Sequence, residues 1–367
     1  MTNQVVRPGV ADPPRTITPV AIASERVPDL TSAEGLANAL GLDRGAVAAV
    51  QVTSTASTGH SSLTFLDVAY ADAVAAVAAS LPTRLMLKHK PPAPSGAKPQ
   101  PMQEVAFYAR VAATLPSPPV VRGLAAQASS AASAGYFLIE DLRATHAARS
   151  SDDDVEADFE LAVDALARIH ASRWEADDRV TWPGGNATES SLRAAVQRIG
   201  TRLPAFFDAA GDALPADGRR LYERVFASTL RPWLRLADGR ALTLVHGSAH
   251  IGNVLFPREP GGDVYLVDWE GWGVDVGARD LAYMMLRRSP DRRRRIEEPL
   301  LRRYHAQLQA QGVRGYGWDD LWTDYRRCWV RNLTVPIRKQ HKSAERWQEL
   351  LDHVTAAYVD LDGDELL

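Results

Sequence analysis

Short apolar runs that end abruptly in polar residues recur along the chain and predict a set of short strands. Two of these runs are 242–245 (LTLV) and 264–267 (VYLV). The Gly-Gly-Asp segment at 261–263 lies between them and is typical of a turn. We therefore expect the two runs to pair as a hairpin, which would bring Asn253 close to Asp268.

Four further strands are expected in the first part of the chain, at 47–52, 63–68, 84–88 and 136–142. A loop of small residues, 53–62, separates the first two. The third strand (RLMLK) ends in Lys88, and the fourth (YFLIEDL) turns polar at its end. The Ala- and Ser-rich segment 125–135 is expected to be a loop.

Apolar residues at helical spacing predict helices at 31–40, 102–115, 159–169, 219–237, 300–311 and 318–337. The first of these opens with Thr31 and Glu34, the spacing of a capping box. The segment 70–79 is compatible with either a helix or a loop. The basic run 291–295 is expected on the surface of a helix.

Composition narrows the class of protein. A chain of 367 residues can bury a large core and divide into two lobes. The net charge of −3 indicates neither a nucleic acid nor a membrane surface as partner. The single cysteine, Cys328, excludes an internal disulfide and fits the cytoplasm. We see no signal peptide and no membrane-spanning stretch, and the Arg- and Ala-rich composition resembles that of a bacterial protein.

The candidate chemistry lies at the ends of the two runs described first. An amide oxygen from Asn253 and a carboxylate from Asp268 suit Mg²⁺, a hard cation that also takes oxygen ligands from phosphates. They do not suit zinc, which prefers His and Cys. The alternative is a polar loop with a solvated Asp, and residue spacing alone does not decide between the two.

The same segment carries a resemblance to a known family. His246-Gly247-Ser248, Asn253, Val267-Asp268-Trp269 and Asp280-Leu281-Ala282 follow the pattern HGD-x-x-x-x-N, then I-D-[WF], then D-L-A. The chain thus resembles the aminoglycoside phosphotransferase and choline kinase-like superfamily, including its ecdysteroid kinase-like branch. One landmark departs from the pattern, because Ser248 stands where the family has its catalytic Asp.

The resemblance implies an α+β, two-lobed, protein-kinase-like fold. Its expected parts are a mobile arm at 1–28, a sheet-containing N-lobe at 29–142 and a mainly helical C-lobe at 143–367. It also implies ATP and Mg²⁺ as cofactors and a small molecule as the acceptor of the phosphoryl group. Neither the acceptor nor the oligomeric state can be named from the sequence.

Site residues follow from the resemblance. Lys88 corresponds to the lysine that binds the α- and β-phosphates, and Glu104 to its ion-pair partner. The loop that covers the nucleotide corresponds to Ser57, Thr58 and Gly59, and the adenine-binding hinge to Glu140 and Leu142. The catalytic loop and metal positions are Ser248, Asn253 and Asp268. The acceptor candidates are Glu270, Trp272, Trp329 and Arg331.

Two residues of the pattern, and one on the helix that resembles the family's helix beneath the catalytic loop, are expected to hold the loop in place and to take no part in the chemistry. Asp280 would tie a helix start to the catalytic loop, His246 would hold the loop, and His170 would act as a structural hydrogen-bonding group. His250 occupies a position where many family members also carry His.

Ser248 leaves three interpretations open, because a serine hydroxyl cannot act as a general base near neutral pH. The acceptor is already ionised and needs no base, or the chain binds nucleotide without turnover as a regulatory pseudokinase, or the serine was introduced to trap a complex. Glu270 and Asp275 are candidates for a substitute base. A metal-dependent hydrolase that uses Asp268 and His250 is a further alternative.

Overall fold

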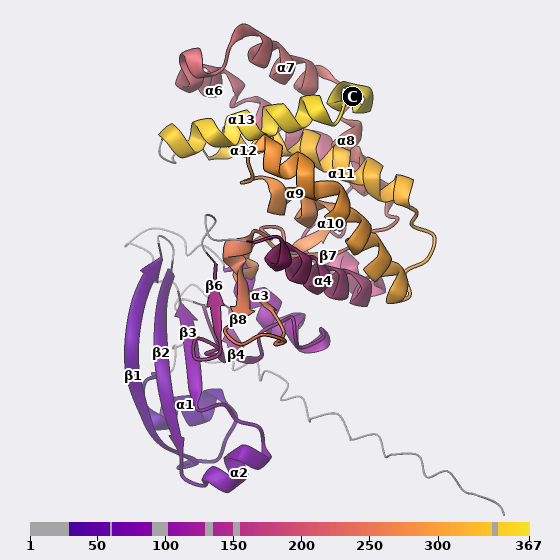
Figure 1. Ribbon diagram of the computed structural model, residues 1–367. Helices are drawn as coiled ribbons and strands as arrows, with labels where there is room; N and C mark the ends of the chain where they lie inside the picture. The colour runs from indigo at the N-terminus through magenta and orange to yellow at the C-terminus, as the bar shows by residue number, and fades with distance from the viewer. Residues whose placement is uncertain (1–28, 59–60, 90–101, 129–134, 150–154, 340–343) are drawn as a thin grey trace, which may run out of the picture. The chain divides into compact units, whose positions relative to one another are not determined.

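The computed structural model describes residues 29–58, 61–89, 102–128, 135–149, 155–339 and 344–367 (Figure 1). The expected arm at 1–28 and the acidic run at 152–154 lie outside these ranges. Within them, no helix combines the length and the apolar character that crossing a bilayer would require.

The chain divides into two compact units. The N-terminal unit comprises the described parts of Met1–Pro101, Tyr108–Ala113 and Arg122–Glu140. The C-terminal unit comprises Met102–Phe107, Thr114–Val121 and the described parts of Asp141–Leu367. The helix α3 (Gln103–Arg110) contributes residues to both units.

A five-stranded antiparallel sheet forms the N-terminal unit, with strand order β1-β2-β3-β5-β4. The strands are β1 (Val47–Thr58), β2 (Ser61–Tyr70), β3 (Arg84–His89), β4 (Gly123–Gln127) and β5 (Tyr136–Glu140). Lys88 lies near the end of β3, opposite Leu63 on one neighbouring strand and Phe137 on the other. The predicted strands are thus present, and strands also occupy parts of two segments that were predicted to be loops.

The segment 53–62, expected to be a loop, is mostly strand. β1 continues to Thr58 and β2 begins at Ser61, with Thr55 opposite Thr64 and Ser57 opposite Ser62. No Gly or Pro interrupts residues 53–58, and threonine favours the pleated backbone, so the ladder extends. Gly59 of the predicted nucleotide loop lies outside the described residues. Part of the second expected loop, 125–135, likewise belongs to β4.

Two short helices accompany the sheet, α1 (Ala33–Ala39) and α2 (Ala73–Ala78). The predicted capping box at Thr31 is wrong, because Ser32 is the N-cap and its hydroxyl accepts from the N–H of Gly35. The Thr31 hydroxyl instead donates to Asp29. Asp72 caps α2, which settles the segment 70–79 as partly helical. Leu36 of α1 packs into one core with Leu66, Leu85 and Leu138 of the sheet.

Helices dominate the C-terminal unit. They are α4 (Glu156–Ser172), α5 (Glu189–Gly200), α6 (Leu203–Ala210), α7 (Ala216–Ala227), α8 (Arg231–Leu234), α9 (Ala278–Met285), α10 (Pro290–Ala310), α11 (Trp318–Asn332), α12 (Thr334–Arg338) and α13 (Ala344–Asp360). α10 packs against α4, and α11 packs against both α9 and α13.

Two of the helix predictions need correction. The expected helix 219–237 breaks between α7 and α8, where Leu230 has a left-handed backbone (φ 63°) and Pro232 follows. The basic run 291–295 is not all on the surface, because Arg293 is 1% exposed. Its guanidinium pairs with Glu297 at 3.0 Å and with Asp360, and burial of a charge requires such partners.

The predicted hairpin between 242–245 and 264–267 is also wrong. β7 (Thr243–Val245) pairs with β10 (Gly273–Asp275), whereas β9 (Tyr265–Leu266) pairs with β8 (Val254–Pro257). β8 lies nearer in sequence, so the Gly-Gly-Asp turn closes a shorter loop with it. β6 (His146–Ala148) completes this second sheet. The expected proximity of Asn253 and Asp268 still results, because the N–H of Val267 donates to the carbonyl of Asn253 at 3.0 Å.

Candidate active site

The loop between β7 and β8, residues 246–253, is held by one buried carboxylate. Asp280, in the first turn of α9, is fully buried and accepts from the N–H of His246 at 2.6 Å and of Gly247 at 2.8 Å. These bonds fix the backbone at the start of the loop, which confirms the predicted role of Asp280. Burial would raise the pKa of Asp280, but the hydrogen bond of His170 and the positive charge of Arg279 outweigh it and lower the pKa.

A hydrogen-bonded chain continues from Asp280 into the core. The Nε2 atom of His170 lies 3.2 Å from Asp280, and its Nδ1 atom lies 2.7 Å from the hydroxyl of Tyr304 on α10. All three side chains are fully buried. The structural role expected for His170 is confirmed, but Tyr304 was not predicted, because it lies 134 residues away and no sequence pattern links the two.

Gly277 makes this chain possible. A Cβ atom there would lie 2.1 Å from the Tyr304 hydroxyl and 2.7 Å from Nδ1 of His170. Any other residue would therefore push the tyrosine and histidine apart. The close packing that Gly277 allows at the start of α9 thus helps to support the loop.

His246 connects the loop to the strand that leads to Asp268. Its Nδ1 accepts from the N–H of Ser248 at 3.3 Å, so its proton sits on Nε2, which donates to the carbonyl of Val267 at 2.9 Å. Burial lowers the pKa of His246, in agreement with a neutral ring. The ring also lies 4.6 Å, centroid to centroid, from Trp269. His246 therefore holds both segments, as predicted.

Asn253 and Asp268 lie at the ends of these two segments. The side-chain nitrogen of Asn253 donates to the carbonyl of Ser248 at 3.0 Å. The other polar atom of this side chain is the amide oxygen, which is the candidate metal ligand. Asp268 is exposed and has a left-handed backbone (φ 65°, ψ 60°), a conformation that non-glycine residues adopt at an energetic cost. An amide oxygen and a carboxylate suit Mg²⁺. Among the described residues, no group of three or more His, Cys, Asp or Glu is placed to hold a metal.

The segment after Asp268 is anchored to the first turn of α3. The Glu104 carboxylate accepts from the N–H of Trp269 at 3.2 Å, and the N–H of Glu104 donates to Glu270 at 3.3 Å. Phe107 stacks on Trp269 with ring centroids 4.0 Å apart. Glu104 is 2% exposed, so these contacts are internal. The sequence did not predict that Glu104 supports the segment carrying Asp268.

Ser248 and His250 are both half-buried and are joined by a backbone hydrogen bond. Ser248 is half-buried, and its carbonyl accepts from the N–H of His250 at 2.8 Å. Burial, followed by the positive charges of Arg287 and Lys339, lowers the pKa of His250 to about 4. His250 is therefore neutral at pH 7 and only a weak base, which disfavours it as a replacement for the missing aspartate.

The residues predicted to contact the acceptor are largely engaged in packing. Trp272 is 5% exposed and its Nε1 donates to the carbonyl of Gln103 at 2.8 Å. Trp329 is fully buried beside Tyr325. Arg331 forms a bidentate pair with Asp275 at 2.8 and 2.5 Å. Glu270 remains exposed, although its carboxylate is bound to α3.

Asp275 does not resemble a substitute base. It is 1% exposed and pairs with Arg279 as well as with Arg331. Burial would raise its pKa, but the charge and hydrogen bond of Arg331 and the charge of Arg279 outweigh it and lower the pKa. A carboxylate so stabilised in its ionised form is a poor proton acceptor.

The residues predicted to bind nucleotide lie mainly in the N-terminal unit. Lys88 on β3 has its Nζ atom 5.8 Å from the centre of the Phe137 ring. Ser57 is exposed on β1, and Thr58 ends that strand. The N–H of Glu140 donates to the carbonyl of Arg122, and the carbonyl of Leu142 accepts from the N–H groups of Thr145 and His146.

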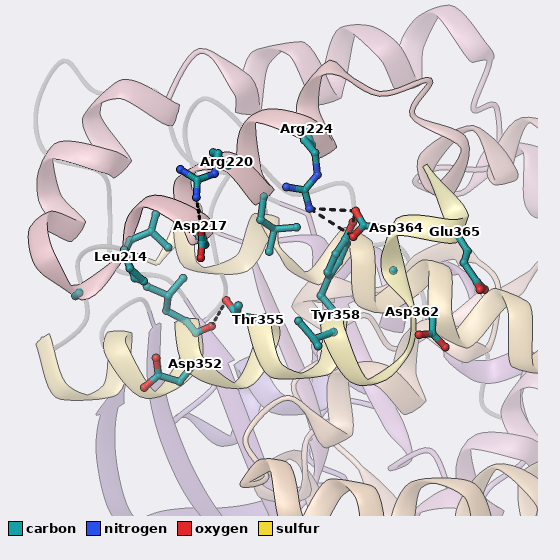
Figure 2. A pocket seen from close by; sticks show the side chains of 17 residues that line it. Leu214, Asp217, Arg220, Arg224, Asp352, Thr355, Tyr358, Asp362, Asp364 and Glu365 are labelled. Atoms are coloured by element: carbon teal, nitrogen blue, oxygen red, sulfur yellow. Dashed lines mark hydrogen bonds and ion pairs between the residues drawn. The ribbon is translucent and has the colours of Figure 1, made fainter.

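A cavity of about 570 Å³ in the C-terminal unit lies elsewhere (Figure 2). Its walls come from α7, α13 and the C-terminal turn Gly363–Leu366. Arg224 and Tyr358 both bind Asp364 there, at 3.1 and 2.8 Å, and Arg220 pairs with Asp217. None of its lining residues belongs to the loop 246–253 or to the segment around Asp268.

The fold and the loop together define a protein of the phosphotransferase class, and comparison with known proteins agrees. A family model described as the phosphotransferase enzyme family matches residues 64–328. The chain therefore belongs to the phosphotransferase enzyme family. No curated protein matches the chain significantly.

Solved structures confirm the predicted fold class. A choline kinase from Cryptosporidium parvum Iowa II is 10% identical, with a TM-score of 0.54 and coverage of 87% of this chain and 91% of that chain. The macrolide 2′-phosphotransferase MphH from Brachybacterium faecium is 16% identical, with a TM-score of 0.50 and coverage of 88% and 96%. At these identities the likeness concerns the fold alone.

Proposed function

We propose that this protein is an ATP- and Mg²⁺-dependent phosphotransferase that acts on a small molecule. The observation that carries the proposal is the joint placement of Asn253 and Asp268. One backbone hydrogen bond joins their segments, and His246 and Asp280 fix the loop that leads to them. Membership of the phosphotransferase enzyme family supports the same reaction. The similar structures named above are a choline kinase and a macrolide phosphotransferase, both enzymes with small acceptors.

In this proposal Asn253 and Asp268 hold the metal ion. Bound Mg²⁺ would bridge phosphate oxygens and neutralise the charge that develops during transfer. One carboxylate and one amide are enough protein ligands, because Mg²⁺ in such sites takes the rest from phosphates and water. Asp268 is exposed, so water and phosphate groups can approach this position.

Lys88 is proposed to bind the phosphates of ATP, with Glu104 as its partner. Glu104 is buried and already bound to the backbone that follows Asp268, so its carboxylate is fixed in place. Ser57, Thr58 and Gly59 are proposed to cover the nucleotide, and the main chain at Glu140 and Leu142 to contact adenine.

The free cysteine, Cys328, fits a cytoplasmic protein.

A second candidate, a nucleotide-binding pseudokinase, is favoured by Ser248. The general base that the resembled family carries at this position is worth about 10²–10⁴ in rate, and a hydroxyl does not replace it. His250 and Asp275 do not supply a base either, for the electrostatic reasons given above. The two candidates share the metal–nucleotide site and differ only in turnover.

Thermal unfolding with ATP, with Mg²⁺ and with both tests the shared site. We expect a cooperative rise in Tm with both ligands, because a ligand that binds only the folded state stabilises it. Asp268→Asn should lose this rise, whereas Asp263→Asn, an exposed carboxylate in the preceding turn, should keep it. No rise with the wild type would refute the proposal. Formation of ADP that depends on an acceptor then separates the enzyme from the pseudokinase.

A further inference from the structure

Cationic side chains gather on the His250 side of the loop. Lys339, just after α12, donates from Nζ to the hydroxyl of Tyr283 on α9 at 3.0 Å. The Tyr283 ring lies 6.5 Å from the ring of His250, two residues from Ser248. Contacts within the C-terminal unit therefore lead from Ser248 through His250 and Tyr283 to Lys339.

Two arginines extend this group. Arg287 follows α9 and is exposed. Among the neighbouring positive charges it contributes most to the lowered pKa of His250. Arg338 ends α12, and its pKa is lowered first by desolvation and then by the positive charge of Arg279. Neither arginine forms an ion pair with any residue that the structure describes. We call Arg287, Arg338 and Lys339 the cationic face.

The neighbouring charges do not neutralise the cationic face. Asp268 acts on His250 with the opposite sign and is a single carboxylate. Asp275, at the end of β10, already binds both Arg279 and Arg331. The cluster of Asp275, Arg279 and Arg331 therefore keeps an excess positive charge. Arg202 also acts electrostatically on Arg338 and adds to it. An excess of unpaired positive charge beside a catalytic loop favours an anionic ligand.

We propose that the acceptor is a small oxyanion, a carboxylate or a phosphate, drawn in by the cationic face and held beside the hydroxyl of Ser248. The inference rests on the proposed function. It gives Ser248 a role, since a hydroxyl donates a hydrogen bond to an oxyanion, whereas an aspartate would repel it.

The reaction needs no general base for such an acceptor. An oxygen of the anion forms the new bond to the γ-phosphorus of ATP, and the bond from that phosphorus to the β,γ-bridging oxygen breaks. ADP leaves with the electron pair. The attacking oxygen carries no proton, so no base is needed, and the products are ADP and an acyl phosphate or a diphosphate.

The test uses the full chain saturated with Mg²⁺ and ADP, so that added anions cannot occupy the nucleotide site. Acetate, citrate and inorganic phosphate serve as probes, and choline serves as a cationic probe. Calorimetric titration should show saturable binding of at least one anion and none of choline. Arg338→Glu and Lys339→Glu should each weaken anion binding about tenfold or more, since a charge-assisted contact is lost and a repulsion gained.

Arg44→Glu is the matched control, because Arg44 is an exposed cation of the N-terminal unit whose partner is Glu34. It should leave anion binding unchanged. Ser248→Asp should abolish anion binding while MgATP still raises Tm. The wild-type protein, incubated with MgATP, acetate and hydroxylamine, should form acetyl phosphate, which hydroxylamine converts to a detectable hydroxamate.

The outcomes separate the two proposals. If MgATP fails to raise Tm, the proposed function fails. If MgATP raises Tm but choline binds and the anions do not, only the anionic acceptor is refuted. Anion binding that Arg338→Glu, Lys339→Glu and Ser248→Asp all leave intact would also refute it.

Discussion

The buried residues that support the catalytic loop and the cationic face beside the loop differ in burial and in hydrogen bonding. The support consists of Asp280, His170 and Tyr304, which are fully buried and joined by hydrogen bonds of 3.2 and 2.7 Å. The cationic face consists of side chains that reach solvent and have few partners. The first arrangement can position a backbone but cannot meet a ligand. The second can attract a ligand but cannot hold the loop.

The same contrast explains which residues match the family pattern. Positions that hold the loop or are proposed to bind the metal, such as His246, Asn253 and Asp268, follow the pattern. Ser248, which would meet the acceptor, departs from it. Within one loop, the positions proposed for the chemistry common to phosphoryl transfer thus follow the pattern, and the position proposed to meet the acceptor departs from it.

The largest expected effect concerns the metal position. Asp268→Asn should lower the rate of ADP formation from MgATP by about 10³-fold or more, because metal stabilisation of transition-state charge is worth several kcal/mol. Asp263→Asn should retain the rate. Equal rates for both variants in a coupled ADP assay would remove Asp268 from the site.

The next effect tests how tightly the loop is packed. Gly247 has φ 78°, and a Cβ atom there would lie 1.8 Å from the carbonyl oxygen of Gly271. Gly247→Ala should reduce the free energy of unfolding by at least about 3 kcal/mol. Gly261→Ala is the control, because Gly261 has φ 84° with open space around it and should cost about 1 kcal/mol. Equal losses by urea denaturation would show that the loop tolerates a side chain.

Removing the buried charge should have a smaller effect. Asp280→Asn keeps the shape but weakens the hydrogen bonds from His246, Gly247 and His170, so we expect a loss of about 2–3 kcal/mol. Because the pKa of Asp280 is lowered in the fold, its contribution is present above its ordinary pKa and disappears as pH falls through the folded value. Wild type and variant should therefore converge in strong acid, and a constant difference would contradict this account.

The smallest expected effect reports on the cationic face. The pKa of His250 is about 4 in the fold, below the ordinary 6.5, so the unfolded chain binds more protons between these values. Stability due to His250 should therefore increase as pH rises from about 4 to 6.5, and His250→Gln should reduce this slope. Lys339→Glu should raise the pKa of His250 by about half a unit, measured by NMR of the ring protons. An unchanged pKa would place Lys339 too far away.

Much of the fold and of the candidate site could be predicted from the sequence, and each wrong prediction has a physical cause. Apolar runs located the strands, but strand pairing depends on which partner is nearest, so β7 was assigned the wrong partner. The family resemblance placed Trp329 at the acceptor site, yet Trp329 is fully buried. The partnership of His170 with Tyr304 and the gathering of the cationic face depend on tertiary packing, which no local pattern encodes.

Binding of Mn²⁺ in the presence of ATP, followed by electron paramagnetic resonance, tests the central claim most directly. The account predicts that the wild type and Asp263→Asn bind the Mn²⁺–ATP complex and that Asp268→Asn and Asn253→Ala lose it. Undiminished binding by Asp268→Asn and Asn253→Ala would contradict the account.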